Sequence, residues 1–99
     1  MKVIMMMRWE GISLDQYEQV RDIVKWETDV PDGAVFHVCA HDGKALRVTD
    51  IWESGEDFNN FVQTRLMPAT MQVGAQGQPE VEIYPVHAIF APETENLSV

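Results

Sequence analysis

The chain has 99 residues, which is enough for one hydrophobic core and too short for a second. Its 45% hydrophobic content is typical of a globular domain and excludes disorder for most of the chain. A formal charge of −9, from 16 acidic and 7 basic residues, repels phosphate backbones and anionic lipids, so we expect no nucleic acid and no membrane among its partners.

One cysteine, Cys39, rules out an intrachain disulfide and is typical of a reducing compartment. The apolar run at residues 3–7 is too short for a signal sequence or a membrane span. We therefore expect a cytoplasmic protein.

The first half of the chain predicts a strand and a helix. Residues 2–9 are apolar on both faces of a two-residue period, as expected of a central strand. Ser13 predicts a helix start, because Gln16 three residues later completes a capping box. This helix is expected to end between residues 26 and 29, before Pro31.

Two further strands, at 34–40 and 45–52, flank the dipeptide Asp42-Gly43. That dipeptide favours a two-residue type I′ turn, which requires positive φ at both central positions. The turn fixes the pairing of the two strands, and with it the side chains that share a face. Both faces of these strands are largely apolar, so both are expected to be covered.

The second half predicts another helix and a fourth strand. Ser54 caps the helix, and Pro68 is expected to kink or restart it, because proline lacks the amide hydrogen. Residues 80–90 alternate as a strand, and 92–99 form a polar, flexible tail. The single domain is therefore expected to span residues 1–91.

Strand-helix-strand repeated twice around a central hairpin is the α+β, ferredoxin-like βαββαβ plan, with a four-stranded antiparallel sheet. Both helices cover one face, which leaves the other open in a monomer. On the two hairpin strands that open face carries a mainly apolar set: Ala34, Phe36, Val38, Arg47, Thr49 and Ile51. An uncovered apolar face is an interaction site or an aggregation hazard, so we expect a homodimer in which two sheets close face to face.

Several short runs point to a known family. They are Phe36-His37-Val38, Val48-Thr49-Asp50-Ile51-Trp52-Glu53-Ser54, Arg65-Leu66-Met67-Pro68-Ala69 and Pro79-Glu80-Val81-Glu82-Ile83-Tyr84-Pro85-Val86-His87. Over nearly the whole chain this pattern resembles small bacterial proteins of the dimeric α/β-barrel superfamily, which includes the antibiotic-biosynthesis-type monooxygenases. The resemblance implies the fold, the dimer, and a pocket between helices and sheet.

One departure from that family concerns haem. Many of these monooxygenases and their haem-degrading relatives carry a histidine on the second helix, and this chain has Phe61 at that place. Residues 58–71 contain no histidine, so the resemblance does not extend to a haem ligand.

His37 and Asp50 are the candidate catalytic pair. The two-residue turn places them on one face, diagonal to each other and within hydrogen-bonding reach. A carboxylate that orients an imidazole fixes its tautomer and raises its basicity, and such a base can deprotonate a phenol or an activated C–H. The alternative is a structural polar pair within an apolar face, because buried charges need partners.

Four further residues are candidate ligand contacts. Trp52 and Tyr17 are expected to line an aromatic pocket, although aromatic side chains also build small cores. His87 is expected to face the pocket or the dimer interface, and Arg47, an arginine among apolar neighbours, should pair with a carboxylate across the dimer or with an anionic ligand. Three dispersed histidines do not form a metal site, and we expect no metal and no cofactor.

Two functions follow from these residues. The first is a cofactor-independent monooxygenase-like enzyme acting on a small aromatic or polyketide-like molecule, with His37 as base and Asp50 as its orienter. The alternative is a non-catalytic dimeric module that binds a small ligand or a partner. The enzyme predicts a cavity of several hundred Å³ beside His37, whereas packed side chains there favour the module.

Overall fold

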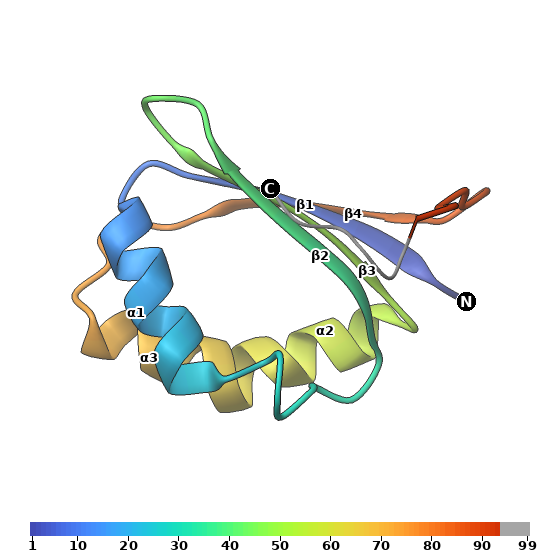
Figure 1. The fold of residues 1–99 in the computed structure, drawn as a ribbon, viewed down its shortest axis with the longest axis horizontal. Coiled ribbons are helices and arrows are strands. Elements are labelled where there is room, and N and C mark those ends of the chain that lie inside the picture. Colours follow the sequence, from blue (N-terminus) through green and yellow to red (C-terminus); the bar gives the residue numbers. More distant parts are fainter. Residues whose placement is uncertain (94–99) are drawn as a thin grey trace.

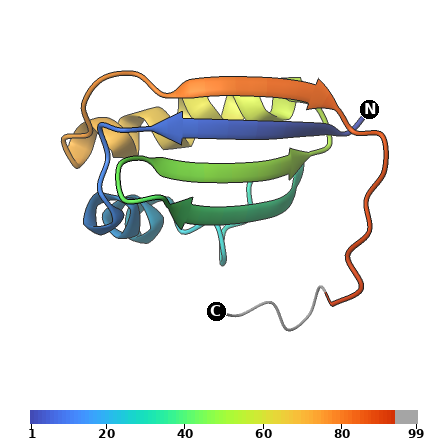
Figure 2. The ribbon, with the colours of Figure 1, turned by 90° about the horizontal axis from the view of Figure 1, so that it is seen from above.

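The computed structural model of the chain describes residues 1–93. Four antiparallel strands form one sheet in the order β2-β3-β1-β4, namely β1 (Val3–Trp9), β2 (Ala34–His41), β3 (Leu46–Trp52) and β4 (Glu80–Pro85). The helical segments are α1 (Leu14–Val24), α2 (Gly55–Phe61), the π-helical turn η1 (Val62–Leu66) and α3 (Met67–Gln72). All of them lie on one face of the sheet (Figure 1), and the four strands run side by side above them (Figure 2). This is the predicted α+β, ferredoxin-like plan.

Helix α1 begins with the predicted capping box. Ser13 Oγ accepts a hydrogen bond from the Gln16 amide at 3.1 Å, and Gln16 Oε1 accepts one from the Ser13 amide at 2.9 Å. The helix ends at Val24, earlier than expected, because Lys25 turns into the left-handed region with φ 58° and closes the last turn. Trp26 is therefore outside the helix, in the loop that leads to β2.

The loop between β2 and β3 is longer than the sequence predicts. Oδ1 of Asp42 accepts hydrogen bonds from the backbone amides of Lys44 at 2.9 Å and Ala45 at 2.8 Å. Of the two expected turn residues only Gly43 has a positive φ, at 94°, so the turn is not of type I′. The carboxylate organises a four-residue loop instead, because it satisfies amides that a two-residue turn would pair across the strands.

This loop moves the pairing of the two strands by two residues. His41 lies opposite Leu46, and His37 lies directly opposite Asp50, whereas the sequence predicted a diagonal relation. Because the shift is even, the side chains from Phe36 onwards keep their predicted faces of the sheet. The correction therefore brings the candidate pair closer together. The prediction for Ala34 is wrong: a bulge between Ala34 and Phe36 breaks the alternation, so Ala34 lies opposite Trp52 and packs against the core instead of the open face.

The second helical segment starts at the predicted cap, where Ser54 Oγ accepts from the Asp57 amide at 3.1 Å. It passes through the π-helical turn immediately before Pro68, and the Met67 amide donates to the Val62 carbonyl five residues earlier. This wide turn is the disruption predicted at Pro68, because proline has no amide hydrogen to continue the regular helical hydrogen bonds.

Strand β4 ends at Pro85, although the sequence predicted a strand up to residue 90. The reason is the partner strand: β1 begins at Val3, which lies opposite Pro85. The Val86 amide still donates to the Lys2 carbonyl at 2.9 Å, and residues 87–91 follow without strand pairing. Most of the predicted tail, residues 94–99, lies outside the described residues.

The core lies between the helices and the sheet. It is built from Met5, Trp9, Ile12, Val20, Val24, Leu46, Val48, Trp52, Phe58, Phe61 and Ala69. On the other face, alternation along the strands presents Ile4, Met6, Phe36, Val38 and Ile51, which are partly or fully exposed. The open face is thus apolar at its centre, as the sequence predicts. Within residues 1–93, no helix has the length and the apolar run that crossing a bilayer requires.

Candidate functional site

The candidate site begins with the pair His37 and Asp50 on neighbouring strands. Nδ1 of His37 lies 2.6 Å from Oδ1 of Asp50. Among residues 1–93, Asp50 is the only buried charged residue, with 6% of its surface exposed, whereas one third of the His37 side chain is exposed. The pair thus joins a carboxylate in the core to an imidazole that reaches the surface.

Trp52 fixes the direction of the hydrogen bonds in this pair. Its indole nitrogen donates to Oδ2 of Asp50 at 3.1 Å. The Asp50 carboxylate accepts hydrogen bonds, so neutral His37 carries its proton on Nδ1 and donates it to Oδ1. The Nε2 atom of His37 is left with a lone pair that points away from Asp50. Trp52 itself is 3% exposed and contacts Asp50, which makes it a core residue that orients the carboxylate.

Tyr17, in the first turns of α1, completes the chain of hydrogen bonds. Its hydroxyl lies 2.6 Å from Nε2 of His37, and the planes of the two rings are nearly parallel, with an interplanar angle of 6°. Burial raises the pKa of the Tyr17 phenol well above its ordinary value, and the neighbouring Cys39 raises it further. The phenol is therefore neutral and donates to the His37 lone pair.

Trp26 packs against both of these rings. Its indole centroid lies 5.2 Å from that of His37 and 5.6 Å from that of Tyr17, with tilted planes. No sequence pattern predicts this contact, because helical spacing places Trp26 at the end of the helix rather than in the loop. Cys39 shares the helix-facing side of β2 with His37, and burial raises the pKa of its thiol, which keeps it protonated.

The structure separates the other two candidate residues from this cluster. Arg47 lies on the open face of β3, where its Nε donates to Oδ2 of Asp42 at 2.9 Å. Its carboxylate partner belongs to its own hairpin loop. His87 is exposed and follows β4, the strand at the opposite edge of the sheet from β2.

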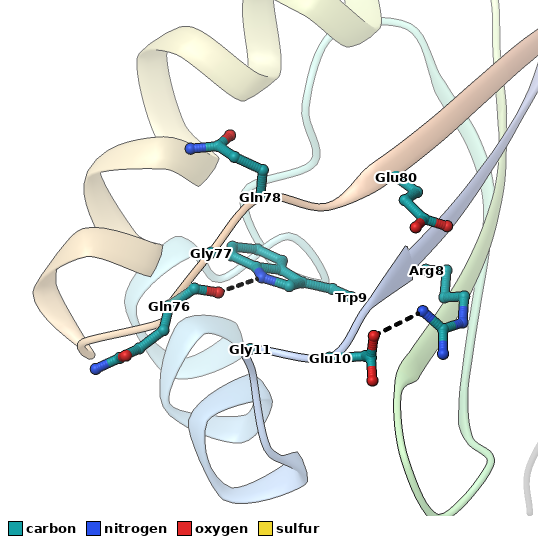
Figure 3. A pocket seen from close by; sticks show the side chains of 8 residues that line it. All are labelled: Arg8, Trp9, Glu10, Gly11, Gln76, Gly77, Gln78 and Glu80. Carbon is teal, nitrogen blue, oxygen red and sulfur yellow. Dashed lines mark hydrogen bonds and ion pairs between the residues drawn. The ribbon is translucent and has the colours of Figure 1, made fainter.

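A hollow of about 390 Å³ lies where β1 ends and β4 begins (Figure 3). Trp9 donates its indole hydrogen to the Gln76 carbonyl at 2.7 Å, and Arg8 donates to Glu10 at 3.1 Å. Gly11 permits the close approach, since a Cβ there would lie 1.6 Å from the Gln76 oxygen. The lining residues are Arg8, Trp9, Glu10, Gly11, Gln76, Gly77, Gln78 and Glu80.

A second, smaller hollow of about 200 Å³ lies beside α2 and the loop before β2. Arg65 borders it and donates to the carbonyls of Val24 and Asp29, both at 2.7 Å, so this guanidinium caps the end of α1. Neither hollow borders His37. Within residues 1–93, no three histidine, cysteine or acidic side chains come together as metal ligands.

No family model matches the sequence, and no curated protein matches it. The fold does match solved structures. The chain is similar to SnoaB, a cofactor-independent oxygenase from Streptomyces nogalater, with a TM-score of 0.66 and 15% identity, over 93% of this chain and 98% of that one.

Two further structures match at a similar level. One is a monooxygenase from Streptomyces coelicolor in complex with nanaomycin D, with a TM-score of 0.60, 17% identity and coverage of 90% and 91%. The other is Rv0793 from Mycobacterium tuberculosis, with a TM-score of 0.65, 14% identity and coverage of 92% and 100%. The chain therefore shares its ferredoxin-like fold with these three solved structures.

Proposed function

We propose that the chain is a cofactor-independent, monooxygenase-like enzyme acting on a small aromatic or polyketide-like molecule. His37 is the general base, Asp50 holds its tautomer, and Trp52 positions Asp50. The observation that carries the proposal is the 2.6 Å contact between His37 Nδ1 and Asp50 Oδ1, which leaves the lone pair on the opposite nitrogen. An imidazole is the side chain most often used for general base catalysis, and a carboxylate partner strengthens it.

The chemistry needs a substrate that can supply electrons. Anthrone is a suitable probe: loss of one proton gives a carbanion that dioxygen oxidises, so that the methylene becomes a carbonyl and the second oxygen atom leaves as water. The substrate is the reductant and dioxygen the oxidant. The protein removes the proton and stabilises the imidazolium that results through the Asp50 carboxylate.

Two of the structurally similar proteins support the proposed class of enzyme. One of them is a cofactor-independent oxygenase and another is a monooxygenase in complex with nanaomycin D. At 15% and 17% identity the shared feature is the fold, so the residues of this chain carry the argument. The exposed third of the His37 side chain offers a route from solvent to the imidazole.

Oxygen uptake in the presence of anthrone tests the enzyme. The wild-type chain is expected to consume dioxygen, and His37→Ala is expected to lower the rate at least about 100-fold, the usual contribution of a general base. The matched control is His41→Gln, at a histidine whose Nδ1 accepts a hydrogen bond from Gly43 in the loop. Equal uptake by wild type and His37→Ala would contradict the proposal.

A non-catalytic module that binds a small ligand or a partner is the second candidate. It is favoured by the packing of Trp26 on His37 and by the position of both hollows away from the imidazole. This reading predicts that anthrone quenches tryptophan fluorescence without being consumed, and that His37→Gln binds it equally well. Consumption that depends on His37 would exclude the module.

The proposed partner is a second copy of this chain, docked through the open face of the sheet. The support is the apolar centre of that face, built by Ile4, Met6, Phe36, Val38 and Ile51. Closing two such faces would bury these side chains within one interface, as a two-fold dimer does. The acidic charge and the single, protonated cysteine support a cytosolic location.

A further inference from the structure

The lone pair of the proposed base is already engaged in a hydrogen bond. It lies on Nε2 of His37, and the Tyr17 hydroxyl occupies that position at 2.6 Å. A substrate can therefore reach the base in only two ways: it displaces the Tyr17 hydroxyl, or it transfers its proton through it.

The order of the hydrogen bonds favours transfer through Tyr17. Trp52 and His37 each donate to one oxygen of Asp50, and Tyr17 donates to His37. In this series of hydrogen bonds, the Tyr17 hydroxyl donates to His37 and His37 donates to Asp50, so both protons are directed towards Asp50. The Tyr17 oxygen is the outer end, and as a hydroxyl it keeps lone-pair capacity to accept one more hydrogen bond.

We propose that Tyr17 is a catalytic residue that relays a proton from the hydroxyl group of a phenolic or enolic substrate to His37. This inference rests on the proposed function and deepens it, because it specifies the substrate class. The substrate O–H bond breaks as its proton moves to the Tyr17 oxygen. The Tyr17 O–H bond breaks at the same time, as that proton moves to Nε2 of His37.

The step is balanced in protons and charge. The substrate becomes an oxyanion, Tyr17 ends as the phenol that it was, and His37 becomes an imidazolium beside the Asp50 carboxylate. No group is oxidised or reduced in this step. Burial around Tyr17 raises its pKa and keeps it neutral, so that it has a proton to pass on. Oxygen acids suit such a relay better than carbon acids, because the protons travel along existing hydrogen bonds.

The aromatic neighbour supports the same substrate class. Trp26 lies 5.6 Å from the Tyr17 ring and remains half-buried, so an aromatic surface stands beside the outer end of the relay. A flat hydroxyarene can pack on this surface while its hydroxyl donates to Tyr17. Anthrone fits this requirement through its enol tautomer, anthrol.

Absorbance of para-nitrophenol tests the relay without requiring turnover, since the phenolate form of this probe is yellow. Bound to the wild-type chain, the probe is expected to ionise at a lower pH than it does free in solution. Tyr17→Phe removes only the hydroxyl and should abolish this shift. The control is Tyr84→Phe, at the other tyrosine of the chain, which is 51% exposed on β4 and should keep the shift. The relay is wrong if the wild type ionises no more probe than solution does, or if Tyr17→Phe retains the effect.

Oxygen uptake with anthrone separates the relay from the proposed function. If both hold, Tyr17→Phe and His37→Ala each lower kcat by about 100-fold or more, with little change in KM for Tyr17→Phe. If substrate instead reaches His37 directly, Tyr17→Phe keeps or raises kcat while His37→Ala abolishes it, and only the relay fails. If His37→Ala keeps the wild-type rate, the proposed function itself fails.

Discussion

Replacing Asp50 by asparagine should reverse the tautomer of His37. The carboxylate now accepts two N–H groups, at 2.6 and 3.1 Å, and an amide offers one oxygen and one NH₂. The Trp52 nitrogen can only donate, so it takes the amide oxygen, and the NH₂ then faces Nδ1 of His37. His37 avoids two opposed donors by moving its proton to Nε2, where it donates to the Tyr17 oxygen.

The size of the stability change follows from the number of hydrogen bonds whose acceptor is no longer charged. Hydrogen bonds to a charged group contribute about 1 kcal/mol more than neutral ones, and two are changed in a site where Asp50 is 6% exposed. Asp50→Asn should therefore lower the free energy of unfolding by about 2 kcal/mol. The base lone pair no longer faces Tyr17, so turnover of anthrone should fall by up to about 10⁴-fold, as in enzymes whose catalytic histidine is held in the wrong tautomer.

Two measurements check this prediction. Heteronuclear NMR of the imidazole nitrogens assigns the His37 tautomer, and urea denaturation gives the stability. The matched control is Asp22→Asn on the exposed side of α1, with an expected change within about 0.5 kcal/mol. The reasoning is refuted if the variant folds and His37 still carries its proton on Nδ1.

Three other predictions concern stability and assembly. Hydrogen bonds from the backbone amides of Ala45 and Lys44, together with Arg47, lower the pKa of Asp42 below its ordinary value of 3.8. Ionised Asp42 therefore stabilises the fold above that pH, and this stabilisation is lost on acidification. The stability difference between wild type and Asp42→Asn, from urea denaturation, should shrink as pH falls below 3.8; a difference independent of pH would contradict this. Phe36→Asp should give a monomer in sedimentation, whereas the wild type and Val30→Asp, in an exposed loop, have twice the mass of one chain. Met5→Ala, at a 1% exposed core position, should cost about 2–5 kcal/mol, against less than about 0.5 for Met71→Ala, which is 74% exposed.

The order and type of the elements could be predicted because local chemistry encodes them. The reciprocal bonds of Ser13 and Gln16 and the cap at Ser54 depend on residues three positions apart. The pairing of β2 with β3 could not be predicted in the same way. It depends on the Asp42 carboxylate, which accepts hydrogen bonds from two backbone amides. These bonds lengthen the loop and move the pairing by two residues.

The candidate site was predictable in part for the same reason. His37 and Asp50 share a face in any pairing of even shift, so alternation alone brings them together. The contact of Tyr17 with His37 joins α1 to β2 across 20 residues, and no local pattern contains it. The pairing of Arg47 with Asp42 could not be predicted either, because the loop that carries Asp42 was expected to be shorter.

The π-helical turn η1 has a consequence for insertions and deletions in this chain. A π turn is an α-helix with one additional residue absorbed locally, so the helices on either side keep their orientation. Removing one residue within 62–66, such as Gln63, would give a regular helix that still turns Phe58 and Ala69 towards the core. The same deletion inside α2 would rotate the following segment by about 100° and expose its apolar side. This segment of the chain should therefore tolerate a change in length that its neighbours do not.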